Sequence, residues 1–91
     1  MQAAISRYLS QIKHCYQKEL PGDPGLAGKV RVYFLIGGDG KVRSTSIVES
    51  TIEHAEVEAC VQTVIRRIKF PKPKGGGQVH VKYPFVFTVA E

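Results

Sequence analysis

Apolar residues recur at intervals of three and four in the first part of the chain, which is the spacing of one face of an amphipathic α-helix. The stripe comprises Ile5, Tyr8, Leu9, Ile12, Cys15, Tyr16 and Leu20. We expect this helix, over residues 5–20, to end near Leu20. Pro21 disfavours a helical conformation in the residue before it, and the turn-rich stretch PGDPGLAG follows.

The hydrophobic period then changes to two, which indicates a strand. The residues that share its apolar face are Val30, Val32, Phe34 and Ile36. The sequence GGDG at 37–40 tolerates positive φ, so we expect the chain to reverse there into a second strand over 41–49. In that strand Val42 and Val48 keep one register and Ile47 breaks it, which a bulge or a partly covered second face would explain.

Helical spacing returns over residues 55–69. The apolar stripe comprises Val57, Cys60, Val61, Val64, Ile65 and Ile68. Glu56 and Glu58 lie in the first turn and basic residues in the last, an order that complements the helix dipole. Pro71 and Pro73 then prevent the helix from continuing.

A third strand, over residues 78–89, places two sets of side chains on opposite faces. The core face comprises Val79, Val81, Tyr83, Phe85, Phe87 and Val89, and the other face His80, Lys82, Pro84, Val86 and Thr88. Because a prolyl nitrogen cannot donate to a sheet ladder, Pro84 restricts this strand to a sheet edge or a bulge.

The order helix, strand, strand, helix, strand predicts an α+β fold with both helices on one face of a three-stranded antiparallel sheet. If the second helix forms a right-handed crossover and the strands that it connects, two and three, run parallel, the first strand fits between them and the third becomes an edge. We expect Phe34, Phe85 and Phe87 to share one core with Ile12 and Val61.

Composition fits a single domain over residues 1–91. The chain is 43% apolar and 23% charged, and no run approaches the roughly 18 apolar residues that cross a bilayer. The net charge of +5 permits nucleic acid, anionic lipid or acidic polymer as a partner without choosing among them.

Cys15 and Cys60, the only cysteines, lie one on each helical stripe. They are either two buried free thiols or a disulfide between helices that face the same sheet. We favour the disulfide, which would close a long loop and imply an oxidising compartment.

Signatures of metal binding or catalysis are missing from the sequence. It has no CxxC or HxxxH spacing for zinc, and we interpret His54 and His80 as exposed polar positions. GGDGK lacks the Ser or Thr of a phosphate-binding loop and precedes a strand. No nucleophile, base and acid set stands out, so we expect neither an enzyme nor a bound cofactor or small-molecule substrate.

The segment RRIKFPKPKGGG combines five basic residues with a proline spacer and a glycine run. Nucleic-acid binding on a sheet would require stacking aromatic side chains beside these charges. Among the aromatic residues of the predicted strands, only Tyr33 is a candidate for stacking on the open face, so nucleic-acid binding is disfavoured.

Several segments together resemble the C-terminal domain of TonB-family proteins. They are GKVRVYFLI, GDGKVRSTSIVESTIEHAEVEACV and VIRRIKFPKPKGGGQVHVKYPFVF, and the resemblance covers roughly residues 5–89. The early CY and the later ACV are similar to the AgmX/PglI C-terminal type of myxobacterial gliding-motility proteins. TonB lacks the cysteine pair, and this chain departs from TonB at Pro84.

The resemblance implies a non-catalytic periplasmic domain, joined to an inner-membrane anchor, that engages an outer-membrane partner in a cell-envelope complex. In TonB a partner segment adds as a further strand to the third strand. The corresponding partner-binding positions here are Gln78, His80, Lys82, Pro84, Val86 and Thr88. The alternative is an anionic-polymer-binding module, for nucleic acid or cell-wall material, that uses the basic face of Arg31, Arg43 and Lys82.

Overall fold

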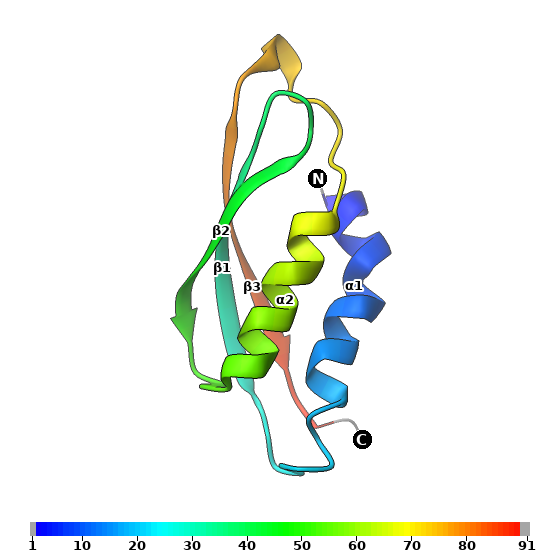
Figure 1. Ribbon diagram of the computed structural model, residues 1–91, viewed down its shortest axis with the longest axis vertical. Helices are drawn as coiled ribbons and strands as arrows, with labels where there is room; N and C mark the ends of the chain where they lie inside the picture. Colours follow the sequence, from blue (N-terminus) through cyan, green and yellow to red (C-terminus); the bar gives the residue numbers. More distant parts are fainter. Residues whose placement is uncertain (1, 90–91) are drawn as a thin grey trace.

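Two helices and three strands follow one another in the predicted order (Figure 1). The structure, a computed structural model, describes residues 2–89. The elements are α1 (Gln2–Gln17), β1 (Gly28–Ile36), β2 (Val42–Ser50), α2 (Ala55–Arg67), the short 3₁₀ helix η1 (Lys74–Gly76) and β3 (Val79–Phe87). Both helices lie side by side on one face of the sheet (Figure 1), which confirms the predicted α+β fold.

The sheet has the order β2-β1-β3, and β1 is antiparallel to both neighbours. Strands β2 and β3 therefore run parallel to each other on either side of β1, and α2 lies in the connection between them, as expected for the crossover. The β1–β3 ladder runs without a register shift from Gly28 opposite Phe87 to Ile36 opposite Val79.

The second strand contains the predicted irregularity. Arg31 pairs with Glu49 and Val32 with Ile47, so Val48 is an extra residue in the ladder. An inserted residue reverses the alternation of side chains between the two faces. A second shift, with Leu35 opposite Ser44 and Ile36 opposite Val42, makes Arg43 an extra residue as well. Val42 and Ile47 therefore both pack against the core, whereas Val48 is 49% exposed. The break in the apolar pattern at Ile47 is thus explained by bulges, one of the two explanations that the sequence left open.

The hydrophobic core lies between the helices and the inner face of the sheet. Phe34, Phe85 and Phe87 belong to one buried cluster with Ile12 and Val61, as predicted. Val89 does not join it: this residue lies beyond the last paired position, Phe87, and is 44% exposed. Neither helix within residues 2–89 is long and apolar enough to span a bilayer.

The first helix ends at Gln17, three residues before the predicted end, and turns continue through Gly22. The backbone N–H groups of Glu19 and Leu20 donate to the carbonyls of Tyr16 and Gln17, three residues back. The hydroxyl of buried Tyr16 then donates to the carbonyl of Leu26. This bond fixes the loop that leads from α1 to β1.

A disulfide joins the two helices. Cys15 of α1 and Cys60 of α2 are bonded, with their Cα atoms 5.6 Å apart. Cys15 is fully buried and Cys60 is partly buried beside the core. The bond confirms the predicted disulfide, and the alternative of two buried free thiols is wrong.

The β1–β2 turn packs against the segment that leads into β3, at the end of the molecule drawn uppermost in Figure 1. Lys41 forms an isolated antiparallel bridge with Lys69, and the N–H of Phe70 donates to the carbonyl of Gly40 at 2.9 Å. Phe70 is buried and stacks on Phe34 with ring centroids 5.6 Å apart. These contacts hold the proline- and glycine-rich segment in an ordered conformation.

Candidate functional site

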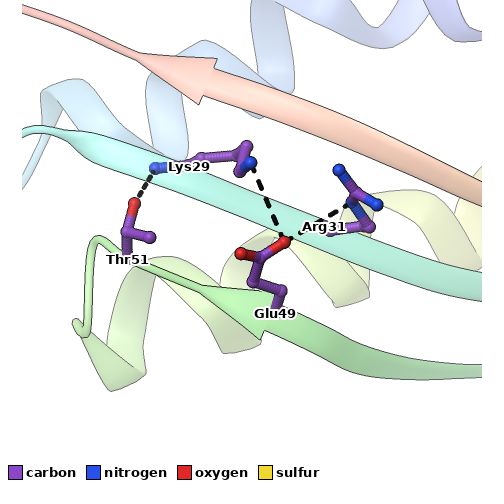
Figure 2. Close-up of polar contacts among 4 residues, drawn as sticks. All are labelled: Lys29, Arg31, Glu49 and Thr51. Atoms are coloured by element: carbon purple, nitrogen blue, oxygen red, sulfur yellow. Dashed lines mark hydrogen bonds and ion pairs between the residues drawn. The ribbon is translucent and has the colours of Figure 1, made fainter.

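The outer side of β3 is a free edge, since its only neighbour among residues 2–89 is β1. The direction of the backbone N–H and C=O groups decides which of them are available for hydrogen bonding at this edge. The carbonyl of Lys29 accepts from the N–H of Thr51, and the N–H of Lys29 donates to Thr51 Oγ1 (Figure 2), both at 2.8 Å. Further along, the N–H of Gly37 donates to the carbonyl of Lys41. Lys29 and Gly37 therefore both face β2.

Consecutive residues of an antiparallel strand direct their N–H and C=O groups to opposite sides. Odd-numbered residues of β1 therefore face β2, and even-numbered residues face β3. The pairs Val30–Phe85, Val32–Tyr83 and Phe34–Val81 are consequently the hydrogen-bonded pairs of the β1–β3 ladder. The residues between them on β3 direct their backbone groups outward.

This register explains why a proline is tolerated at position 84 of β3. Pro84 lies opposite Arg31, which faces β2, so the prolyl nitrogen points away from β1 and its missing N–H breaks no ladder bond. The free edge offers the N–H groups of His80, Lys82 and Val86. It also offers the carbonyls of these three residues and of Pro84.

The side chains of these edge residues lie on the open face of the sheet. His80, Lys82, Pro84 and Val86 are exposed, and Val86 is 68% exposed. Gln78 and Thr88, also predicted as partner-binding, are exposed but flank β3 outside its bounds. The structure thus brings four of the six predicted residues together on one strand edge.

An aromatic pair on the open face was not foreseen. The hydroxyl of Tyr33 and Nδ1 of His80 are 2.8 Å apart, and their rings stack with centroids 5.9 Å apart. The sequence placed both residues on the open face, but their contact depends on the β1–β3 register. The pair fixes the His80 ring beside the free edge.

The basic face proposed as an alternative is largely matched by acidic groups. Glu49 Oε1 lies 3.7 Å from Arg31 Nε and 3.8 Å from Lys29 Nζ (Figure 2). Arg43 pairs with Asp39 at 3.3 Å. The backbone N–H of Lys41, which donates to Asp39, and the charge of Arg43 both lower the pKa of the Asp39 carboxyl. Within the described chain only Lys82 of the three basic residues has no ion-pair partner.

Three residues with metal-ligand side chains meet where α1 ends and α2 begins. Glu19, His54 and Glu56 each offer an atom within 4.8 Å of the others. His54 Nδ1 accepts from the N–H of Val57 as the N-cap of α2. A neutral ring therefore carries its proton on Nε2, 3.7 Å from Glu19 Oε1.

A metal ion on His54 would need the lone pair of Nε2, because Nδ1 already accepts the hydrogen bond from Val57. In the neutral ring that Nε2 lone pair is taken by the proton. The cluster is therefore explained as a capped helix start, and His54 is partly buried instead of exposed as predicted. The disulfide also removes both cysteines as thiolate ligands.

These features define a class: a small α+β domain with two helices on one face and a free sheet edge on its third strand. The model of the family described as Gram-negative bacterial TonB protein C-terminal matches residues 23–89. The chain therefore belongs to the TonB C-terminal family. Domains of this family are periplasmic, non-enzymatic modules that interact with protein partners in the envelope.

Solved structures share this fold. The solution structure of the Pseudomonas aeruginosa TonB C-terminal domain is 22% identical, with a TM-score of 0.65, over 84% of this chain and 78% of that one. The Helicobacter pylori TonB C-terminal domain, residues 179–285, is 25% identical, with a TM-score of 0.57, over 93% and 83% of the two chains. A search of curated proteins returned no match.

Proposed function

We propose that this domain binds a protein partner of the cell envelope by addition of a partner strand along the outer edge of β3. The observation that carries the proposal is the alternation along β3. Inward side chains fill the core, while the outward N–H and C=O groups of His80, Lys82 and Val86 have no strand of the described residues 2–89 beside them. Main-chain hydrogen bonds supply affinity in this mode of recognition, and side-chain contacts supply specificity.

Pro84 divides the edge into two parts. A partner strand that crosses it loses one ladder hydrogen bond, a net loss of about 0.5–1.5 kcal/mol. Continuous pairing is therefore favoured on the His80–Lys82 side. The same proline limits edge-to-edge self-association of the free domain.

The cellular setting belongs to the same proposal. We place the domain in the AgmX/PglI type, as part of a gliding-motility or TonB-like complex anchored in the inner membrane, with a partner associated with the outer membrane. The CY and ACV motifs that carry this resemblance supply the two bonded cysteines. A transmembrane helix and a proline-rich linker upstream of the domain in the full-length protein would support this setting.

Amide hydrogen exchange over β3, with and without a candidate partner segment, tests strand addition. The amides of His80, Lys82 and Val86 should exchange fast in the free domain and slowly in the complex. The inward amides of Val81, Tyr83 and Phe85 are an internal control, because they should be protected in both states.

A second measurement uses Pro84→Val, which restores the missing donor and should tighten binding or promote self-association. If the three outward amides exchange equally fast with the partner bound, the partner docks elsewhere. If they are already protected in the free monomer, the edge is not free. Either result contradicts strand addition.

The polymer-binding alternative has less support. Arg31 and Arg43 already face carboxylates, so the basic face has little unmatched charge for a polyanion.

A further inference from the structure

Unmatched positive charge gathers at one end of the molecule. Four exposed lysines, Lys41, Lys69, Lys72 and Lys74, form what we call the basic tip. None of them has an ion-pair partner in the part of the chain that the structure describes. The nearby Asp39 is already occupied by Arg43 and by the N–H of Lys41.

The described acidic residues other than Asp39 belong to the opposite end of the fold. They are Glu19 and Asp23 after α1, Glu49 near the end of β2, and Glu53, Glu56 and Glu58 around the start of α2. The β1–β2 turn and η1 lie at the top of Figure 1, whereas these acidic segments lie toward the bottom. The molecule measures 45 × 22 × 17 Å. The separation of the basic tip from the acidic residues therefore polarises the charge of the described chain along its long axis.

The fold holds lysines of the tip close together, which costs free energy through repulsion between their like charges. Lys41 and Lys69 are directly opposite in an antiparallel bridge, and like charges in that position destabilise the pairing. The segment between Lys69 and Lys74 is ordered by buried Phe70, by Pro71 and Pro73, and by a hydrogen bond from Gly76 to Pro73. An anionic partner would relieve this repulsion without having to order the loop.

We propose that the basic tip docks end-on on the phosphate headgroups of an anionic lipid bilayer. The β1–β2 turn and η1 project from the end of the molecule (Figure 1), a shape that meets a plane better than it encloses a chain. The aromatic residue of the tip, Phe70, is buried, so it cannot stack on nucleic-acid bases. Lysines near an anionic membrane surface act additively, each strengthening binding about fivefold.

Co-sedimentation with vesicles tests this docking. The vesicles contain equal parts of phosphatidylglycerol and phosphatidylcholine, or phosphatidylcholine alone. Lys72→Gln/Lys74→Gln should weaken binding to the anionic vesicles by about thirtyfold at low salt. The matched control Lys13→Gln/Lys18→Gln removes the same charge from exposed positions near the C-terminal end of α1, away from the basic tip. It should change binding little. High salt should abolish binding of the unmodified domain.

Three outcomes would overturn the proposal. Equal weakening by the two double variants would show that net charge alone acts. Equal binding to neutral vesicles would show that the phosphates of anionic lipids are not read. Binding to soluble polyglutamate, but not to vesicles, would assign the tip to an acidic peptide. Circular dichroism of both variants checks that the fold is intact.

Discussion

At the residue scale, the tip depends on a glycine where no other residue fits. Gly40 has φ of 85°, and a Cβ atom there would lie 2.1 Å from the carbonyl oxygen of Phe70. The Gly40 carbonyl itself accepts from the Phe70 N–H. Gly25 has neither the positive φ nor the close neighbour of Gly40. A Cβ atom at Gly25 would meet open space.

We therefore predict that Gly40→Ala destabilises the domain by at least about 1–3 kcal/mol, because it adds a backbone strain of that order to a steric clash. Gly25→Ala should be neutral or slightly stabilising. Urea denaturation of both variants measures the difference in the free energy of unfolding. Equal midpoints would mean that the turn can move away from Phe70 at no cost.

At the scale of the element, β3 combines a buried face with the edge that we propose as the partner-binding site. Phe85 is buried, lies opposite Val30 and contacts the Tyr83 ring with centroids 4.9 Å apart. The next residue, Val86, points to the open face. Of these two adjacent positions, one is thus expected to matter for stability and the other lies on the proposed binding edge.

Phe85→Ala should cost about 3–5 kcal/mol through lost burial and the remaining cavity. Val86→Ala should change stability by less than about 0.5 kcal/mol, as is usual for surface substitutions. Thermal or chemical denaturation distinguishes the two. A nearly unchanged midpoint for Phe85→Ala would show that the face assignment of β3 is wrong.

At the scale of the whole molecule, α1 is joined to α2 by packing and by one covalent bond. The two bonded cysteines are 45 residues apart. Closing a loop of that length restricts the unfolded chain and contributes about 4 kcal/mol in the chain-entropy model. That is a large share of the stability of a domain of this size.

Reduction of the disulfide, or Cys15→Ala/Cys60→Ala, should therefore lower the free energy of unfolding by about 4 kcal/mol. Denaturation with and without reductant measures the loss. Mass spectrometry after thiol alkylation of the unreduced, denatured protein should find no labelled cysteine. Two labelled cysteines would contradict the bond.

The sequence by itself determined the type and order of the helices and strands and most of the faces of α1, β1, α2 and β3. These properties follow from local periodicity, which is set by backbone geometry and by the burial of one apolar face. Leu9 and Val89, which were expected on apolar faces, are exposed. Pro84 further indicated an edge strand, because a missing N–H is tolerated only there or at a bulge.

Only the tertiary structure decided which residues meet across the sheet and between the helices. The exposure of Val48, the outward direction of the Pro84 nitrogen and the Tyr33–His80 contact all depend on strand register, and a shift of one residue would reverse each of them. The Glu19–His54 pair and the Lys41–Lys69 bridge join segments far apart in the sequence. No local pattern encodes such contacts, because they arise only when the packed core fixes the distances between elements.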